Sequence, residues 1–272
     1  MSERFAATLS ERDLNFIIRT VATERKDYEN IARIVRDKPD LIDLMLDDEK
    51  LFRRVISHED ILLEISPRLL FEILLRRAHK ELRSGSFTLE RVGITQKIPV
   101  FDSDKVIGLL SDRAVKDYLA DMLSSFTRVN STSIYFKVGN RFYRRSYSDM
   151  DIDDMIELSN LVEEESRFPF YKRIGDIALF LIGIFPEHVL SGYPRRVRSA
   201  TASRKRRSLE DYENEGARFY QLAAEYAESK ATNLSEVLLK LSQNFTLAKK
   251  PLNFIAERYI QRSKFKWFAS SI

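Results

Sequence analysis

The chain has 272 residues, of which 44% are hydrophobic and 32% are charged, with eight Gly, seven Pro and no Cys. This composition is typical of a globular protein with a substantial core, and it excludes a disordered chain. The absence of Cys excludes a disulfide framework and thiolate metal sites, and it fits a reducing compartment. The N-terminus lacks the apolar segment of a signal peptide, and the most apolar run, residues 177–185, is about half a membrane span long. We therefore expect a cytoplasmic protein.

The first 85 residues are predicted to form helices. Ser10 is placed to cap a helix whose apolar residues recur at helical spacing. Pro39 opens a short helix through residue 46, and Asp47 or Asp48 caps the next one. Ser66 and Pro67 start a longer helix over residues 67–83, because Ser favours the cap and Pro favours the first helical position.

The middle third combines helices with a hairpin. After the 67–83 helix we predict a short strand around residues 87–89, helices over 104–110 and 113–125, and a hairpin of 134–138 and 141–145. This order of elements is that of a winged helix, a fold that often binds nucleic acid, although a fold does not establish a function. We predict a mainly α, multi-helical protein with a small central β-hairpin, winged-helix-like in its middle third.

The Gly139-Asn140 turn fixes the register of this hairpin, with Phe136 opposite Tyr143 and Lys137 opposite Phe142. Side chains alternate between the two faces of a strand. One face, expected to sit on the core, carries Ile134, Phe136, Val138 and Tyr143. The other face alternates aromatic and cationic residues: Tyr135, Lys137, Phe142 and Arg144.

After residue 150 the pattern is again helical. We predict one helix over residues 151–165, an apolar helix over 170–185 and a third over 209–230. In the third, Gly216 and Ala223 are small enough to let another helix approach closely. Asn233 or Ser235 starts the next helix, and Pro251 begins the last. The predicted regions are 1–66, 67–147 and 148–272, which can also form one compact domain.

The 170–185 helix carries a resemblance. Its sequence, Tyr171-Lys-Arg-Ile-Gly-Asp-Ile-Ala-Leu-Phe-Leu-Ile-Gly-Ile-Phe-Pro186, followed by Tyr212, Gly216 and Tyr220, resembles a pattern in uncharacterised prokaryotic proteins. The resemblance covers a minor part of the chain. It implies a shared helical fold and no particular chemistry.

Charge is strongly segregated along the chain. The segment 195–207 contains seven basic residues and no acid, and without them the net charge of +4 would become −3. A second basic run lies at 249–266, whereas 148–166 carries eight acids and no base. Because Lys and Arg clusters neutralise phosphates, segment 195–207 is the sharpest candidate for binding an anionic partner. The alternative is a solvated loop, or one that packs on the acidic 148–166 segment.

The charge of one predicted helix conflicts with nucleic-acid binding by a winged helix. Its second helix, from Arg113, would expose Asp117 and Asp121, and these carboxylates would face phosphates unfavourably. Contact through the hairpin, or a purely structural or protein-binding role, agrees better with this charge. The predicted nucleic-acid-binding residues are therefore Arg195, Arg196, Arg198, Arg204, Lys205, Arg206 and Arg207 of the basic segment, with Lys137, Arg141, Arg144 and Arg145 of the hairpin.

No catalytic, cofactor or metal motif stands out. Residues 149–153 begin like a calcium loop, but Asp154 and Asn160 stand where Gly and Glu are needed, so these acids are better explained as a helix N-terminus. The three His are scattered, and neither a phosphate-binding Gly-rich loop nor a Gly-x-Ser-x-Gly motif occurs. Asp176, within an apolar helix, needs a partner. Lys172 or Arg173 could form a structural ion pair with it, and the alternative is a catalytic acid.

These observations predict a non-enzymatic protein that binds an anionic partner, most simply nucleic acid, through the basic segment and the hairpin. An alternative is a helical adaptor or self-associating protein that docks on an acidic protein surface. A second alternative is an enzyme acting on a phosphorylated small molecule, with a pocket near Asp176 or the aromatic residues of the 212–226 stretch.

Overall fold

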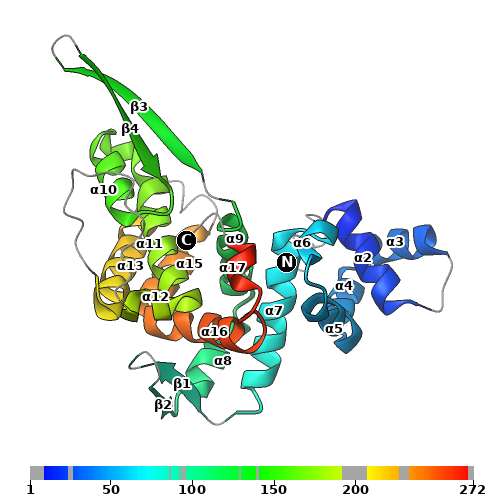
Figure 1. Ribbon diagram of the computed structural model, residues 1–272. Helices are drawn as coiled ribbons and strands as arrows, with labels where there is room; N and C mark the ends of the chain where they lie inside the picture. Colours follow the sequence, from blue (N-terminus) through cyan, green and yellow to red (C-terminus); the bar gives the residue numbers. More distant parts are fainter. Residues whose placement is uncertain are drawn as a thin grey trace.

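The computed structural model describes residues 9–23, 27–85, 87–91, 93, 96–128, 130–138, 141–191, 207–226 and 233–268. Most of these residues are helical, and the described strands form two separate antiparallel pairs, which confirms the mainly α class with a small central hairpin (Figure 1). The elements in the first half of the chain are α2 Glu11–Val21, α3 Tyr28–Asp37, α4 Pro39–Leu46, α5 Glu49–Ser57, α6 Ile61–Glu64, α7 Pro67–Leu82, β1 Thr88–Arg91, β2 Lys97–Val100, α8 Ser103–Ser111 and α9 Arg113–Ser125.

The second half begins with the hairpin and continues as helices. Its elements are β3 Ser131–Val138, β4 Arg141–Ser148, α10 Ile152–Asn160, a 3₁₀ turn Glu164–Ser166, α11 Phe168–Ile184, α12 Pro186–Ser191, α13 Leu209–Ala224, α15 Leu234–Gln243, α16 Phe245–Arg258 and α17 Lys264–Trp267. Within the described ranges, no helix has both the length and the apolar character needed to cross a membrane.

The N-terminal helices begin at the predicted caps. The side chains of Ser10, Asp48 and Ser66 accept hydrogen bonds from backbone N–H groups in the first turns of α2, α5 and α7, respectively. The carboxylate of Asp13, which is 2% exposed, accepts a 2.7 Å bond from the N–H of Ser66. This bond joins the start of α2 to the start of α7, so the caps also connect the N-terminal helices to the rest of the fold.

Helix α11 lies at the centre of the C-terminal helices and packs against α10, α13 and α16. Small residues permit this packing, because a Cβ at Gly216 would lie 2.8 Å from Cβ of Ala178 on α11. A Cβ at Gly175 of α11 would likewise lie 2.4 Å from the ring of Tyr220 on α13. The predicted close approach of another helix at Gly216 is confirmed.

The prediction that Pro251 begins the last helix is wrong. Pro251 lies inside α16, and α17 follows it. A proline normally breaks a helix because it lacks an N–H and clashes with the preceding turn. Tertiary packing outweighs this preference here: Leu252 is fully buried against Gly183, and the side-chain amide of Asn253 donates to the carbonyls of Ile182 and Gly183 at 2.8 and 2.7 Å.

The predicted single helix over residues 151–165 is also wrong in part. Helix α10 ends at Asn160, and Glu164–Ser166 forms a separate 3₁₀ turn. Three consecutive glutamates, residues 163–165, would otherwise have occupied the last turn of the helix. The negative end of the helix dipole disfavours carboxylates there, and like charges on adjacent turns repel.

The strand predicted around residues 87–89 is present as β1, but its partner is β2 and not the hairpin. In a winged helix this strand would join the hairpin in one sheet, so the described strands do not support that arrangement. Strand β2 was not predicted because it is four residues long and contains Pro99, which weakens a strand signal. The sheet exposes large apolar side chains: Phe87, Leu89, Ile98 and Phe101.

Candidate nucleic-acid interface

Strands β3 and β4 form an arm that extends beyond the helices (Figure 1). The register is the predicted one, with Phe136 opposite Tyr143 and Lys137 opposite Phe142. Each strand has eight residues, so the arm is about 26 Å long. Residues 131–148 include four basic residues and no acid. The arm therefore presents only positive formal charge.

The base of the arm is fixed to the helical body. The Arg173 side chain on α11 donates a 2.8 Å bond to the carbonyl of Asp149 and another 2.8 Å bond to the hydroxyl of Ser125. Its guanidinium also lies 4.0 Å from the ring centroid of Phe126. At the end of β4, the N–H of Ser148 donates to Asp154 at 2.8 Å. These contacts hold the β4 end of the hairpin against α10 and α11, and Arg173 also connects it to the end of α9.

The two faces of the arm have different surroundings. On the inner face, near the base, Arg145 pairs with Glu157 of α10, and the Tyr147 hydroxyl donates to the same carboxylate at 3.1 Å. Tyr147 is 4% exposed. Ile134, opposite Arg145 on this face, is only partly buried. It is therefore not fully covered by the core as expected, and the side chains of Phe136, Val138 and Tyr143 lie outside the described set.

The outer face is exposed. Tyr135 is 67% exposed, and the guanidinium of Arg144 lies 5.8 Å from its ring centroid. Nε of Arg144 donates a 3.0 Å bond to the hydroxyl of Ser133, which holds the guanidinium near the ring. Within the described part of the chain, no carboxylate pairs with Arg144. The pair Lys137 and Phe142 occupies the next position of this face in the backbone register.

The acidic residues beside the base of the arm are largely neutralised by local contacts. Asp151 caps α10 by accepting from the N–H groups of Asp153 and Asp154 at 3.0 and 3.2 Å. Asp149 lies 3.4 Å from the Arg173 guanidinium. These carboxylates serve as caps and ion-pair partners, as the helix N-terminus interpretation predicted. In the described residues, no group of three or more metal-ligating side chains is present.

The basic segment 195–207 lies outside the described residues except for Arg207. This arginine, with a side chain 7% exposed, bonds Asp153 of α10 at 2.6 Å and Glu215 of α13 at 2.5 Å. The two carboxylates raise the pKa of Arg207, although its burial acts in the opposite sense. The predicted alternative, packing on the acidic 148–166 segment, therefore applies to Arg207. The segment ends at α10, the helix that contacts β4 at the base of the arm.

The second basic run, 249–266, is mostly engaged inside the fold. Lys249 and Lys250 are 6% and 5% exposed, and both interact with Glu90 of β1. Lys264 is 5% exposed and donates to the carbonyl of Ile184 at 3.0 Å. The pairs completing this set are Lys249–Glu213, Lys250–Asp102, Arg258–Glu81, Lys264–Glu187 and Lys266–Asp60. These pairs connect α16 and α17 to neighbouring elements, so the run does not form a free basic patch.

Helix α9 does not resemble a recognition helix, because its acidic side is engaged with a neighbouring helix. Its Asp117 and Asp121 both pair with Arg68 of α7, at 3.1 and 2.5 Å. Arg68 also pairs with the buried Glu72 at 2.9 Å. The acidic side of α9 is thus turned toward its own neighbour, so the arm is a better candidate for phosphate contact than this helix.

Asp176 forms the predicted ion pair with Lys172, at 2.7 Å, and it has two further partners. The hydroxyls of Tyr118 on α9 and Tyr220 on α13 donate to its other oxygen at 2.6 and 2.8 Å. Burial, and then the Asp176 charge, raise the pKa of both tyrosines well above the usual value, so both hydroxyls keep their protons. Arg173, the other proposed partner, lies instead at the base of the arm. Both carboxylate oxygens are occupied, which favours the structural role over the catalytic one.

His79 gives the fold a pH dependence. Burial lowers its pKa to about 4, and the nearby Lys116 and Arg83 act in the same direction. The unfolded chain therefore binds a proton more readily than the folded protein between pH 6.5 and about 4, so stability should decrease as the pH falls through this window. Urea unfolding at several pH values should show this decrease. A His79→Gln variant should show a smaller decrease, and equal pH dependence of the two proteins would contradict the assignment.

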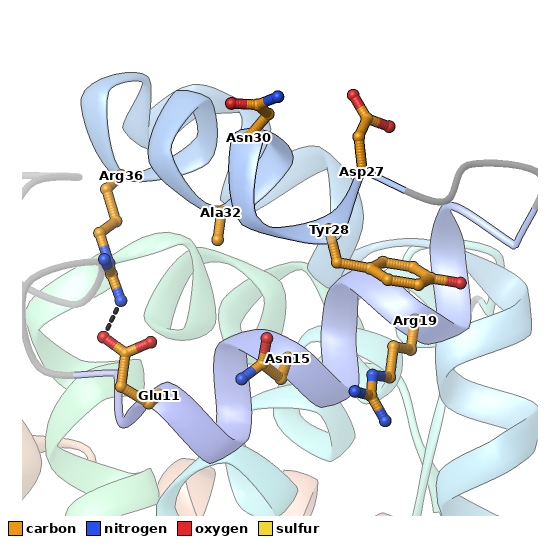
Figure 2. Close-up of a pocket in the computed structure, with 8 residues that line it drawn as sticks. All are labelled: Glu11, Asn15, Arg19, Asp27, Tyr28, Asn30, Ala32 and Arg36. Atoms are coloured by element: carbon orange, nitrogen blue, oxygen red, sulfur yellow. Dashed lines mark hydrogen bonds and ion pairs between the residues drawn. The ribbon is translucent and has the colours of Figure 1, made fainter.

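A cavity of about 660 Å³ lies between α2 and α3, away from the arm. Figure 2 shows Arg36 reaching across it to Glu11 and the ring of Tyr28 near Arg19. The residues lining the cavity are Glu11, Asn15, Arg19, Asp27, Tyr28, Asn30, Ala32 and Arg36. They balance two acids against two bases and include no His, Ser or Lys. This cavity therefore favours neither an anion site nor nucleophilic catalysis, and it is not the pocket considered near Asp176.

Tyr135 was not among the predicted binding residues, although the alternation of aromatic and cationic residues on its strand could have identified it. The structure distinguishes Arg144, which pairs with no carboxylate of the described residues, from Arg145 and Arg207, which each pair with one or two. The side chains of Lys137 and Arg141 lie outside the described set. Comparison of the chain with protein-family models, with curated proteins and with solved structures found no match.

Proposed function

We propose that this protein binds nucleic acid non-enzymatically and contacts phosphates with the arm. The proposal is based on the β-hairpin, which contains no acidic residue and is bonded to the helices at its base. On this hairpin Arg144 lies exposed beside Tyr135. Basic side chains neutralise phosphates and release condensed counterions, which supplies most of the affinity of such contacts. An arm about 26 Å long is sufficient to follow several nucleotides along a strand.

The basic segment 195–207 is the second element of the proposal. Arg207 is engaged with Asp153 and Glu215, so the residues proposed to contact phosphates are the other six of this segment. Arg207, the last residue of the segment, is anchored on α10, and α10 contacts strand β4 of the arm. Two basic elements that contact the same polyanion would bind it more strongly than either alone.

Binding should weaken steeply as salt increases. Fluorescence anisotropy with labelled oligonucleotides of about 20 nucleotides, longer than one small binding surface covers, would measure Kd from about 50 to about 200 mM salt. The variant Arg141→Ser/Arg144→Ser should weaken binding roughly tenfold at low salt and lower the slope of log K against log salt by about 1.4–1.8. Replacing Arg204, Lys205 and Arg206 with Ser should also lower the slope.

A matched control separates local contact from net charge. Arg12→Ser/Arg53→Ser removes two exposed arginines on α2 and α5, at the other end of the molecule from the arm (Figure 1). This control should leave the slope unchanged. No binding by the wild-type protein at low salt, to either DNA or RNA, would reject the proposed function.

Self-association is the second candidate function. The apolar side chains exposed on and beside β1 and β2 favour it, above all Phe101 directly after β2, which is 80% exposed. Light scattering on the same samples distinguishes the two functions. A salt-sensitive dimer without nucleic-acid affinity would favour an adaptor or self-associating protein.

A further inference from the structure

We infer that the outer face of the arm stacks unpaired bases, so that the preferred ligand is single-stranded nucleic acid. This inference rests on the proposed function and specifies its ligand. The outer face is defined by Tyr135, Arg144 and Ser133, with Lys137 and Phe142 next in register. It is distinct from the inner face, where Arg145 and Tyr147 are engaged with Glu157.

Tyr135 offers a surface on which a base can stack. A tyrosine ring is a large apolar surface, and 67% of this residue is exposed although it lies on a rooted, hydrogen-bonded strand. Because most of this residue is exposed, it contributes little to packing in the described structure. Stability therefore does not explain why an aromatic residue stands at this position. Aromatic side chains on positively charged surfaces are the usual stacking partners of bases in proteins that bind single strands.

A guanidinium lies beside the Tyr135 ring. Arg144 lies opposite Tyr135 in the antiparallel register, and its bond to Ser133 holds it 5.8 Å from the ring centroid. A base stacked on Tyr135 would therefore place its phosphate within reach of a cation on the adjacent strand. The next pair in register, Lys137 and Phe142, again combines one cationic and one aromatic residue, about 7 Å further along the arm.

An exposed tyrosine ring favours a single strand over a duplex. In a duplex the faces of the bases are stacked on one another, and only their edges are accessible in the grooves. Arginine can read those edges, but a tyrosine ring needs an exposed base face. Among the described side chains of the outer face, Tyr135 is the aromatic one and is 67% exposed, which favours stacking over reading of base edges.

The test compares single-stranded and duplex oligonucleotides of the same sequence by anisotropy at low salt. The wild-type protein should bind the single strand more tightly. Tyr135→Ala should weaken single-strand binding roughly 5- to 150-fold, the equivalent of about 1–3 kcal/mol for one stacked base. It should leave the salt slope, the duplex affinity and the melting temperature unchanged. Tyr135→Phe, which keeps the ring, should retain affinity, whereas Arg144→Gln should lower the slope by about 0.7.

Phe101→Ala is the control, because it removes another exposed aromatic ring, 80% exposed and directly after β2, and it should not change nucleic-acid affinity. Tighter binding to the duplex, or an equal loss on both ligands in Tyr135→Ala, would overturn the single-strand inference. If Arg141→Ser/Arg144→Ser still lowered the slope in that case, the proposed function would stand. Absence of any nucleic-acid binding would overturn both.

Discussion

Replacing Asp176 with alanine is expected to lower the free energy of unfolding by about 3–5 kcal/mol, as for the loss of one partner from a buried charged cluster. Asp176 is 1% exposed and accepts from the hydroxyls of Tyr118 and Tyr220 as well as from Lys172. Lys172, with 31% of its side chain exposed, can turn to water. The two buried hydroxyls cannot, and each unsatisfied donor costs about 1–3 kcal/mol.

Urea unfolding followed by circular dichroism would measure this loss as a lower midpoint at unchanged slope. Asp176→Asn is the matched control: it keeps an oxygen acceptor for the tyrosines and removes the charge, so its effect should be clearly smaller. A loss of less than about 1 kcal/mol in Asp176→Ala would mean that water or a neighbouring group replaces the carboxylate. The Asp176→Asn variant also tests whether Asp176 has only a structural role. In that case the folded variant should bind nucleic acid like the wild type.

The environment of Asp176 illustrates which contacts could be predicted from sequence. Lys172 lies four residues before Asp176, and such pairs share one face of a helix, so this partner was predicted and is confirmed. Tyr118 and Tyr220 are 58 and 44 residues away along the chain. Their approach depends on how α9, α11 and α13 pack, and no local pattern encodes that packing.

The same distinction applies to the arm. The turn and the alternating residues predicted the register and the division into two faces, both of which follow from local backbone geometry. They could not predict how far the arm projects, or that Glu157 would engage Arg145 and leave Arg144 exposed. Runs of charge were the least informative signal, since Lys249 and Lys250 are buried among carboxylates supplied by distant segments.

The same substitution should have opposite effects at two helical glycines. Alanine favours a helix over glycine by about 0.8–1 kcal/mol, and Gly108 on α8 is exposed with open space around a new Cβ. Gly108→Ala should therefore stabilise the protein by about that amount. Gly216 on α13 is buried, and a Cβ there would lie 2.2 Å from Cζ of Phe245 and 2.8 Å from Cβ of Ala178.

For Gly216→Ala the steric cost should exceed the gain in helix propensity. Phe245 is 4% exposed, so its ring has little space to move, and the Ala178 contact belongs to the buried helix α11. Overpacking of this kind costs about 1–3 kcal/mol or more, and urea unfolding should therefore show a net loss. Stabilisation by both alanines would mean that α13 can move away from α11 and α16 at little cost. A gain at Gly108 with a loss at Gly216 would show that close helix packing, and not helix propensity, determines which glycines this fold requires.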